Sequence, residues 1–222
     1  MNTTETLLTR ARAAFATAGH TIENVRRDFP EWHLGRPHYA LWALDVDTAP
    51  IRDAMAAADA PLDALLLDAY GRQAHITLAL CGFPCDTPRH ADDFGPEALA
   101  RQLAALEASG VEAFTLQVGR LASFTSAPFL AVHDEGGGIA RLRRALTGDT
   151  AEPGGPYTPH VTVGLYAGAW PTAEVLPRLD AFDAGPPLSC TIDSVSLMRY
   201  AAPDIGGPLE TLGRFRFGHG FG

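Results

Sequence analysis

Two short stretches of the sequence place a histidine at the start of an apolar run and a threonine two residues later. The first reads HITL and begins at His75, and the second reads HVTV and begins at His160. Successive side chains of a β-strand point to opposite faces, so His75 shares a face with Thr77, and His160 shares a face with Thr162. The third residue on that face is small both times, Ala79 and Gly164, which leaves room for a ligand.

This pair of motifs suits acid–base chemistry at a phosphodiester. An imidazole titrates near pH 6.5, so one histidine can accept a proton while a second, charged one donates a proton. Two threonine hydroxyls can donate hydrogen bonds to anionic oxygens between them. In-line displacement at phosphorus needs a base for the attacking water and an acid for the leaving oxygen on the opposite side.

Other chemistries find less support in the sequence. The motif strands contain no acidic residues, so no metal site is predicted, and no cofactor-binding fingerprint or P-loop is present. A single His-x-Thr is expected by chance from eight histidines and abundant threonine. A structural protein with two coincidental motifs therefore stays an alternative, and it predicts histidines that lie far apart or in separate cores. A binding module that holds a nucleotide or RNA end without turnover is another.

The surrounding segments predict an α+β fold of two related halves, because the order strand, helix, histidine strand occurs twice. A helical and loop extension is expected over 1–36, with a single domain over 37–222. Strands are predicted over 39–47, 75–83, 113–124, 128–134, 160–166, 188–200 and 209–217. Helices are predicted over 49–70 (one, or two broken at Pro61), 95–110, 136–148 and 172–182, with a loop over 149–159.

Composition limits the partners. The formal net charge of −9 argues against binding along a nucleic acid duplex, which requires a basic face. No apolar run is long enough to span a bilayer, and no secretory signal is apparent, so no membrane partner is expected. Cys81, Cys85 and Cys190 lack metal-site spacing and are expected to be reduced thiols of a cytoplasmic protein. A monomer is the default for a self-contained two-lobed chain.

HITL and HVTV resemble the paired His-x-Thr-x motifs of the two-histidine (2H) phosphoesterases, which include bacterial 2'-5' RNA ligase-like proteins acting as RNA 2',3'-cyclic phosphodiesterases. The likeness runs from about Tyr39 to Phe217. It implies a bilobal fold with a pseudo-twofold axis, antiparallel sheets flanked by helices, and a central cleft. It also implies metal-free hydrolysis of a 2',3'-cyclic phosphate to a 2'-phosphate. His75 would be the general acid and His160 the general base.

The resemblance further implies that Thr77 and Thr162 hold the non-bridging oxygens. Several family members carry an arginine shortly after the second motif, where this chain reads GLYAG. Arg199, Arg120 and Arg72 are possible substitutes. The substrate is expected to be a small nucleotide or an RNA end.

Phe124 and Tyr157 could stack on a base. Variants of the same chemistry, cleavage or ligation of 2',5'-linked oligonucleotides, stay open beside the non-catalytic binding module.

Overall fold

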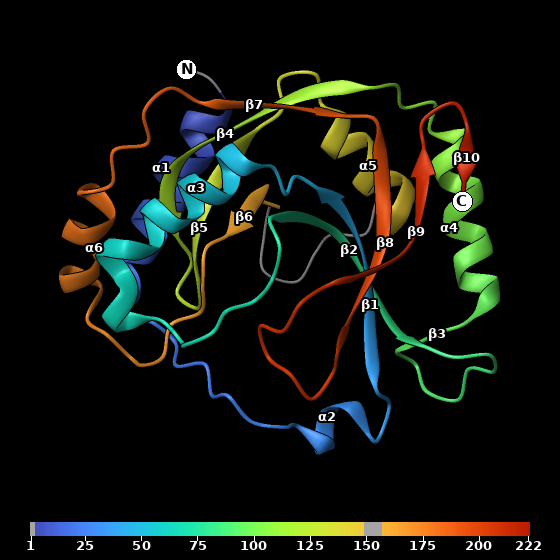
Figure 1. The fold of residues 1–222 in the computed structure, drawn as a ribbon, viewed down its shortest axis with the longest axis horizontal. Helices are drawn as coiled ribbons and strands as arrows, with labels where there is room; N and C mark the ends of the chain where they lie inside the picture. The colour runs from blue at the N-terminus through green and yellow to red at the C-terminus, as the bar shows by residue number, and fades with distance from the viewer. Residues whose placement is uncertain (1–2, 149–156) are drawn as a thin grey trace.

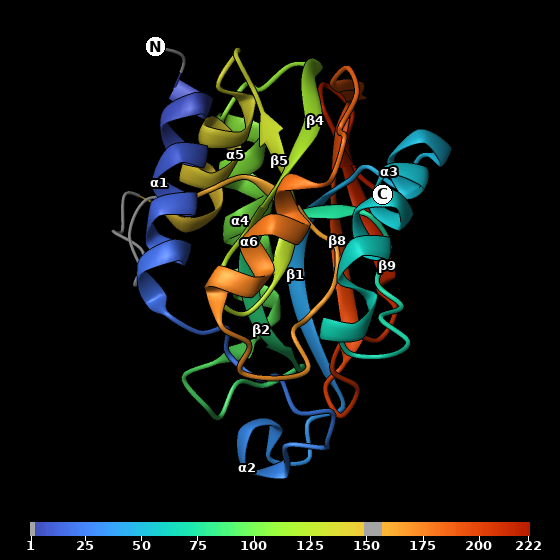
Figure 2. The same cartoon turned by 90° about the vertical axis from the view of Figure 1, so that its left-hand side faces the viewer.

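The computed structural model describes residues 3–148 and 157–222. Its strands form two sheets, which Figures 1 and 2 show from two sides. The predicted loop over 149–159 lies, up to residue 156, outside the described residues.

The larger sheet has six strands in the order β10-β9-β8-β1-β2-β3. All of its pairings are antiparallel except β2 with β3. Its strands are β1 (His38–Asp45), β2 (His75–Pro84), β3 (Asp93–Phe94), β8 (Ser194–Ala201), β9 (Glu210–Arg216) and β10 (Gly220–Phe221).

The smaller sheet has four antiparallel strands in the order β6-β5-β4-β7. Its strands are β4 (Phe114–Ser123), β5 (Pro128–His133), β6 (His160–Thr162) and β7 (Leu188–Ile192). Two corresponding units result, β1–α3–β2 and β5–α5–β6, and in each the histidine strand pairs directly with the strand before it. The predicted α+β fold of two related halves is confirmed.

Helices flank both sheets (Figure 1). They are α1 (Thr3–Ala18), α2 (Pro30–His33), α3 (Ala49–Asp59), α4 (Pro96–Ala108), α5 (Gly138–Thr147) and α6 (Thr172–Asp180), with a 3-10 turn η1 (Ala60–Leu65) after α3. The 3-10 turn begins just before Pro61, which cannot continue the hydrogen bonding of α3. The main core contains side chains of both sheets, with Trp42, Ile76 and Leu78 from the first and Leu116 and Val161 from the second.

The single strand predicted over 188–200 is in fact two strands, β7 and β8, which belong to different sheets. The chain passes from the smaller to the larger sheet at Asp193, whose carbonyl accepts a hydrogen bond from the Phe217 amide. The apolar alternation changes phase here, from Leu188, Cys190 and Ile192 to Val195 and Leu197, and the two polar residues Asp193 and Ser194 lie at the crossing.

The first histidine strand contains a register shift opposite Trp42 and Ala43 of β1: Trp42 pairs with Ala79, whereas Ala43 pairs with Thr77. Leu78 is the extra residue of this bulge, and the alternation of faces is reset after it. Ala79 is therefore buried in the main core, and the prediction that it shares the face of His75 and Thr77 is wrong.

The second histidine strand ends at Thr162, four residues earlier than predicted. After it, the Val163 amide still donates a hydrogen bond to the Pro128 carbonyl. A Cβ atom on Gly164 would lie 2.8 Å from Leu66 Cδ1, so this glycine makes room for a packed leucine and not for a ligand.

Residues 1–36 begin with α1, which packs on the smaller sheet beside α6 (Figure 2). Phe15 of α1 is buried against Tyr166, and Leu8 and Ala11 contact a cluster that contains Phe129. The division of the chain at residue 36 stays a prediction. None of the described helices combines the length and the apolar character needed to cross a membrane.

Candidate active site

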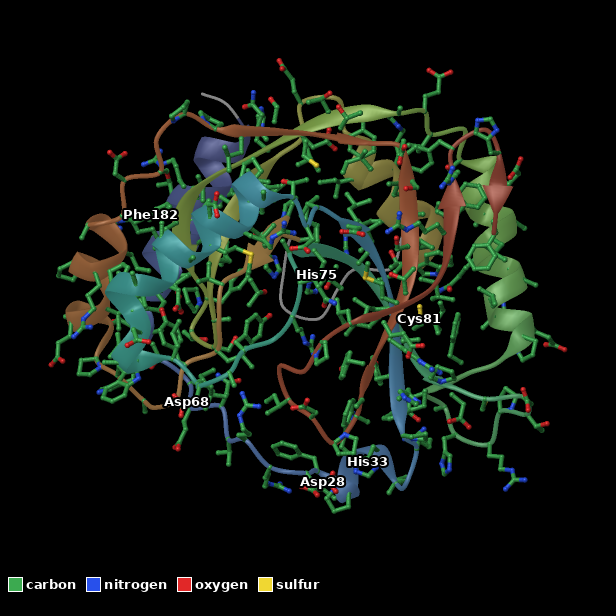
Figure 3. All side chains as sticks on the ribbon, in the orientation of Figure 1. Asp28, His33, Asp68, His75, Cys81 and Phe182 are labelled. Atoms are coloured by element: carbon green, nitrogen blue, oxygen red, sulfur yellow. The ribbon has the colours of Figure 1, made fainter. Side chains whose placement is uncertain are left out.

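The two histidine strands belong to different sheets, yet β2 and β6 contact each other where the halves meet. Figure 3 shows His75 near the middle of the molecule. His160 is close enough to His75 for a positive charge on one ring to disfavour protonation of the other. The structure therefore brings the two predicted motifs together.

Both imidazoles are held by the same contact. Nδ1 of His75 lies 2.8 Å from the carbonyl oxygen of Gln73, and Nδ1 of His160 lies 2.8 Å from the carbonyl oxygen of Thr158. A carbonyl oxygen can only accept, so Nδ1 carries the proton in each ring. Nε2 is left in each ring as the nitrogen that exchanges protons with a ligand.

His75 is only 7% exposed and lies in a charged environment. Burial lowers its pKa to about 4, and the nearby positive charge of Arg72 and the neighbouring His160 act in the same direction. Asp45, which faces His75 across the β1–β2 ladder, opposes this shift. In the ligand-free protein, His75 is consequently a neutral imidazole at pH 7.

His160 lies in an aromatic environment. Its ring meets Phe124 edge-on at a centroid distance of 4.9 Å and lies 5.3 Å from Phe129. The two phenylalanines stack on each other at 4.3 Å. Burial lowers the pKa of His160, and the hydrogen bond with the carbonyl of Thr158 partly opposes the shift. Phe124, one of the aromatic residues predicted from the sequence to be able to stack on a base, thus lies beside the second histidine.

The two threonines differ in their partners. The Thr162 side chain interacts with the hydroxyl of Tyr70, a residue in the loop before β2. Within the described part of the chain, the Thr77 hydroxyl makes no hydrogen bond. Sequence reasoning missed Tyr70, and no motif or spacing in the sequence points to it, because it reaches Thr162 only through the meeting of the two halves.

Tyr157 is placed behind the first histidine strand. Its hydroxyl donates a 2.6 Å hydrogen bond to the Thr77 carbonyl, and its ring packs on the main core. The guanidinium of Arg143 lies 3.5 Å over this ring and also donates to the Leu78 carbonyl. These contacts satisfy β2 carbonyls beside the bulge, so the partly buried Tyr157 braces a strand from the other half. Its stacking on a base stays a prediction.

The three arginines considered for the phosphate have different surroundings. Arg199 pairs with Glu210 at 2.8 Å. Side chains alternate along β8, so Arg199 points to the face opposite to that of Met198 and away from the histidines. Arg120 lines a cavity between α1, β4 and α6. Arg72 lies beside His75, with its guanidinium 4.1 Å over the Tyr200 ring.

A cavity of about 310 Å³ opens next to this arginine. Its lining includes Tyr70, Arg72 and Val163, the residue after Thr162, together with Asp59, Asp63 and Asp68. Among the described residues, no group of three or more His, Cys, Asp or Glu side chains is arranged to hold a metal ion. Metal independence stays a prediction.

Comparison with known proteins gives a family and a fold. The family model of the 2'-5' RNA ligase superfamily matches residues 37–204. The chain resembles crystal structures of Escherichia coli LigT complexed with 3'-AMP, at a TM-score of 0.53 and 18% identity, and in apo form, at 0.51 and 17%. Each comparison covers 82% of this chain, and 99% and 98% of the LigT chain respectively. No curated protein matches the sequence.

Proposed function

Because the chain belongs to the 2'-5' RNA ligase superfamily of two-histidine phosphoesterases, we propose that it hydrolyses a 2',3'-cyclic phosphate, on a nucleotide or an RNA end, to a 2'-phosphate. The observation that carries the proposal is the shared setting of His75 and His160. Each ring is anchored through Nδ1, each presents Nε2, and the two rings are near enough to interact electrostatically.

The reaction divides the proton transfers between the rings. Following the family resemblance, Nε2 of His160 removes a proton from water as its oxygen attacks phosphorus. The bond from phosphorus to the 3'-oxygen breaks, and that oxygen takes a proton from Nε2 of His75. The products are a 2'-phosphate and a 3'-hydroxyl, and Thr77 and Thr162 donate hydrogen bonds to the non-bridging oxygens.

The acid role of His75 requires the substrate. Its pKa of about 4 in the ligand-free protein leaves it unprotonated at neutral pH. A phosphodiester carries a negative charge, and an anion beside an imidazole raises its pKa by favouring the charged form. Substrate binding therefore helps to load the proton that the leaving oxygen needs.

A small substrate fits the rest of the site. Phe124 offers a partly exposed aromatic ring beside His160, suited to a base, whereas the net charge of −9 disfavours long nucleic acid. The E. coli LigT structure with 3'-AMP has the same fold and holds a nucleotide. The enzyme is proposed to be cytoplasmic, monomeric, and independent of metals and cofactors.

The direct test is phosphorus NMR of the protein with a nucleoside 2',3'-cyclic phosphate in EDTA. We expect conversion to the 2'-phosphate by the wild type and by His219→Ala, which alters an exposed histidine in the β9–β10 turn. His75→Ala and His160→Ala should each lose the activity. Strict dependence on an added divalent metal would contradict the proposed roles.

A wild type that leaves the cyclic phosphate intact would redirect the assay to a 2',5'-linked dinucleotide. Cleavage of that substrate would keep the chemistry and change the bond. If both substrates stayed intact but a nucleotide bound, the chain would be a non-catalytic binding module.

A further inference from the structure

Arg72 is a guanidinium without a counterion in an acidic protein. Among the described residues, no carboxylate lies within ion-pair distance of it, and its Nε atom is buried without a hydrogen-bond partner. Other arginines of the chain bind carboxylates, as in the pairs Arg12–Asp180 and Arg36–Asp93. A partly buried cation with an unused donor is costly unless an anion completes its surroundings.

The loop that carries Arg72 is fixed at several points. The Leu67 amide bonds the Leu165 carbonyl at 2.8 Å, and the Gly71 amide bonds the Gly206 carbonyl at 2.9 Å. The Gln73 side chain makes two hydrogen bonds with the backbone of Leu209, of 2.8 and 3.0 Å.

These contacts hold Ala69, within the loop, at a φ of +51°, a conformation that alanine adopts only at a cost. The loop thus presents Arg72 in one place, and the Tyr200 ring 4.1 Å from the guanidinium holds its head.

The neighbours of Arg72 indicate which anion would bind. Arg72 is close enough to act electrostatically on His75, whose Nε2 is available, and on Tyr70, whose hydroxyl interacts with Thr162. The cavity of about 310 Å³ beside Arg72 is also lined by Asp59, Asp63 and Asp68, which would repel an anion among them. An anionic group is therefore favoured close to the arginine and the motif residues.

We propose that Arg72 is the phosphate-binding cation of this site and that its guanidinium contacts a non-bridging oxygen of the substrate. The inference rests on the proposed function for the identity of the substrate. It supplies the positive charge that the GLYAG segment after the second motif lacks, and it takes that charge from the loop before the first motif. Arginine suits this position because its donors match the geometry of phosphate oxygens.

The first measurement compares kcat/KM for a nucleoside 2',3'-cyclic phosphate in Arg72→Ala, Arg72→Lys and the control Arg199→Ala. Arg72→Ala should lower kcat/KM about 100-fold or more, as expected for losing one charge-stabilising donor, and lysine should restore part of it. Arg199→Ala should stay within about twofold, as is usual for a surface change. An Arg72→Ala enzyme as active as the control would overturn the inference and leave the proposed function standing.

The second measurement needs no turnover and uses inorganic phosphate as the probe. Titration calorimetry should show at least about tenfold weaker phosphate binding by Arg72→Ala, since charge-assisted hydrogen bonds are lost. If the wild type were inactive on the cyclic phosphate but bound phosphate through Arg72, the inference would stand and the proposed function would fall. Equal phosphate binding by wild type and variant would overturn the inference.

A third readout separates phosphate binding from a merely structural role. The charge of Arg72 helps to lower the pKa of His75, together with His160 and against Asp45. In a folded Arg72→Ala protein, an NMR titration should show a higher pKa for His75, and Arg72→Lys should keep it low. An unchanged pKa would mean that the guanidinium does not act at this site.

Discussion

The two histidine strands perform the same task in different settings. β2 has ten residues and lies inside a six-stranded sheet, whereas β6 has three residues and forms the edge of a four-stranded sheet. His75 has a cation and an aspartate nearby, and His160 has two aromatic rings. The anchoring of Nδ1 on a carbonyl two residues earlier is common to both.

This difference shows how a repeated motif yields two histidines in unlike surroundings. The backbone contact fixes the tautomer and orientation of each ring, so it has to be the same in both halves. The surroundings set the proton affinity and the ligand contacts, so they can diverge. The charged side near Arg72 suits a phosphate and the aromatic side near Phe124 suits a base, which gives the substrate a direction across the site.

A change of leaving group is the most direct test of whether His75 and His160 have different roles. His75→Ala should lose about 10²–10⁴-fold in rate on the cyclic phosphate, the usual contribution of general acid–base catalysis. A p-nitrophenyl phosphodiester has a leaving group that needs no proton, so the same variant should recover most of the rate. His160→Ala should stay slow on both substrates, because water still needs its base.

If the p-nitrophenyl substrate restored the rate of His160→Ala and not that of His75→Ala, the acid and base roles would be reversed. The pKa of His75, about 4 in the ligand-free protein, is the reason to measure both variants on both substrates. The exposed His219→Ala serves again as the matched control for both substrates.

The burial of His75 should also make the stability of the fold depend on pH. His75 has a folded-state pKa of about 4, below its value of about 6.5 in the unfolded chain. The unfolded chain therefore binds more protons between these values, and the fold loses stability as the pH falls from about 6.5 to about 4, with no further loss below.

The size of this loss is about 3 kcal/mol for His75, and His160, whose pKa is also lowered by burial, should contribute a loss in the same direction. Urea unfolding of the wild type, His75→Asn and His160→Asn at pH 7 and pH 4 measures it. Only the difference between wild type and variant reports the histidine, since other groups titrate in the same range. If the wild type and His75→Asn lost the same unfolding free energy between pH 7 and pH 4, His75 would not be buried as a neutral ring.

The aromatic side can be tested through Phe124. Phe124→Leu should raise KM for a nucleoside cyclic phosphate by about tenfold, within the 1–3 kcal/mol typical of base stacking. Ribose 2',3'-cyclic phosphate, which has no base, should be unaffected by the change. A similar loss on both substrates would mean that Phe124 supports the His160 ring and does not contact a base.

The smallest expected effect concerns the brace between the halves. Tyr157→Phe leaves the Thr77 carbonyl without its 2.6 Å hydrogen bond and should cost about 1 kcal/mol of unfolding free energy. Activity should fall by less than about tenfold, because β2 keeps its ladder with β1. Tyr166→Phe, which removes a 2.7 Å bond to Ser123, is the control for a similar loss of stability with activity kept.

The sequence by itself determined the two motifs, the local secondary structure around them and the repeated order of elements. Strand alternation needs only nearest neighbours along the chain, so His75 and Thr77, and likewise His160 and Thr162, could be assigned to one face directly. Pro61 and the glycines at both ends of α5 set boundaries through backbone geometry alone. These features depend on local chemistry, which the sequence displays.

Only the tertiary structure decided which distant residues complete the site. The bulge at Leu78 moves Ala79 to the core, and the crossing at Asp193 divides the strand predicted over 188–200 between two sheets. Both features depend on the partner strands. The choice of Arg72 over Arg199 depends on which face of β8 points to the histidines and on which carboxylate is near. Burial, which lowers the pKa of both His75 and His160, and the neighbouring charges that act on His75 arise only once the two halves have met.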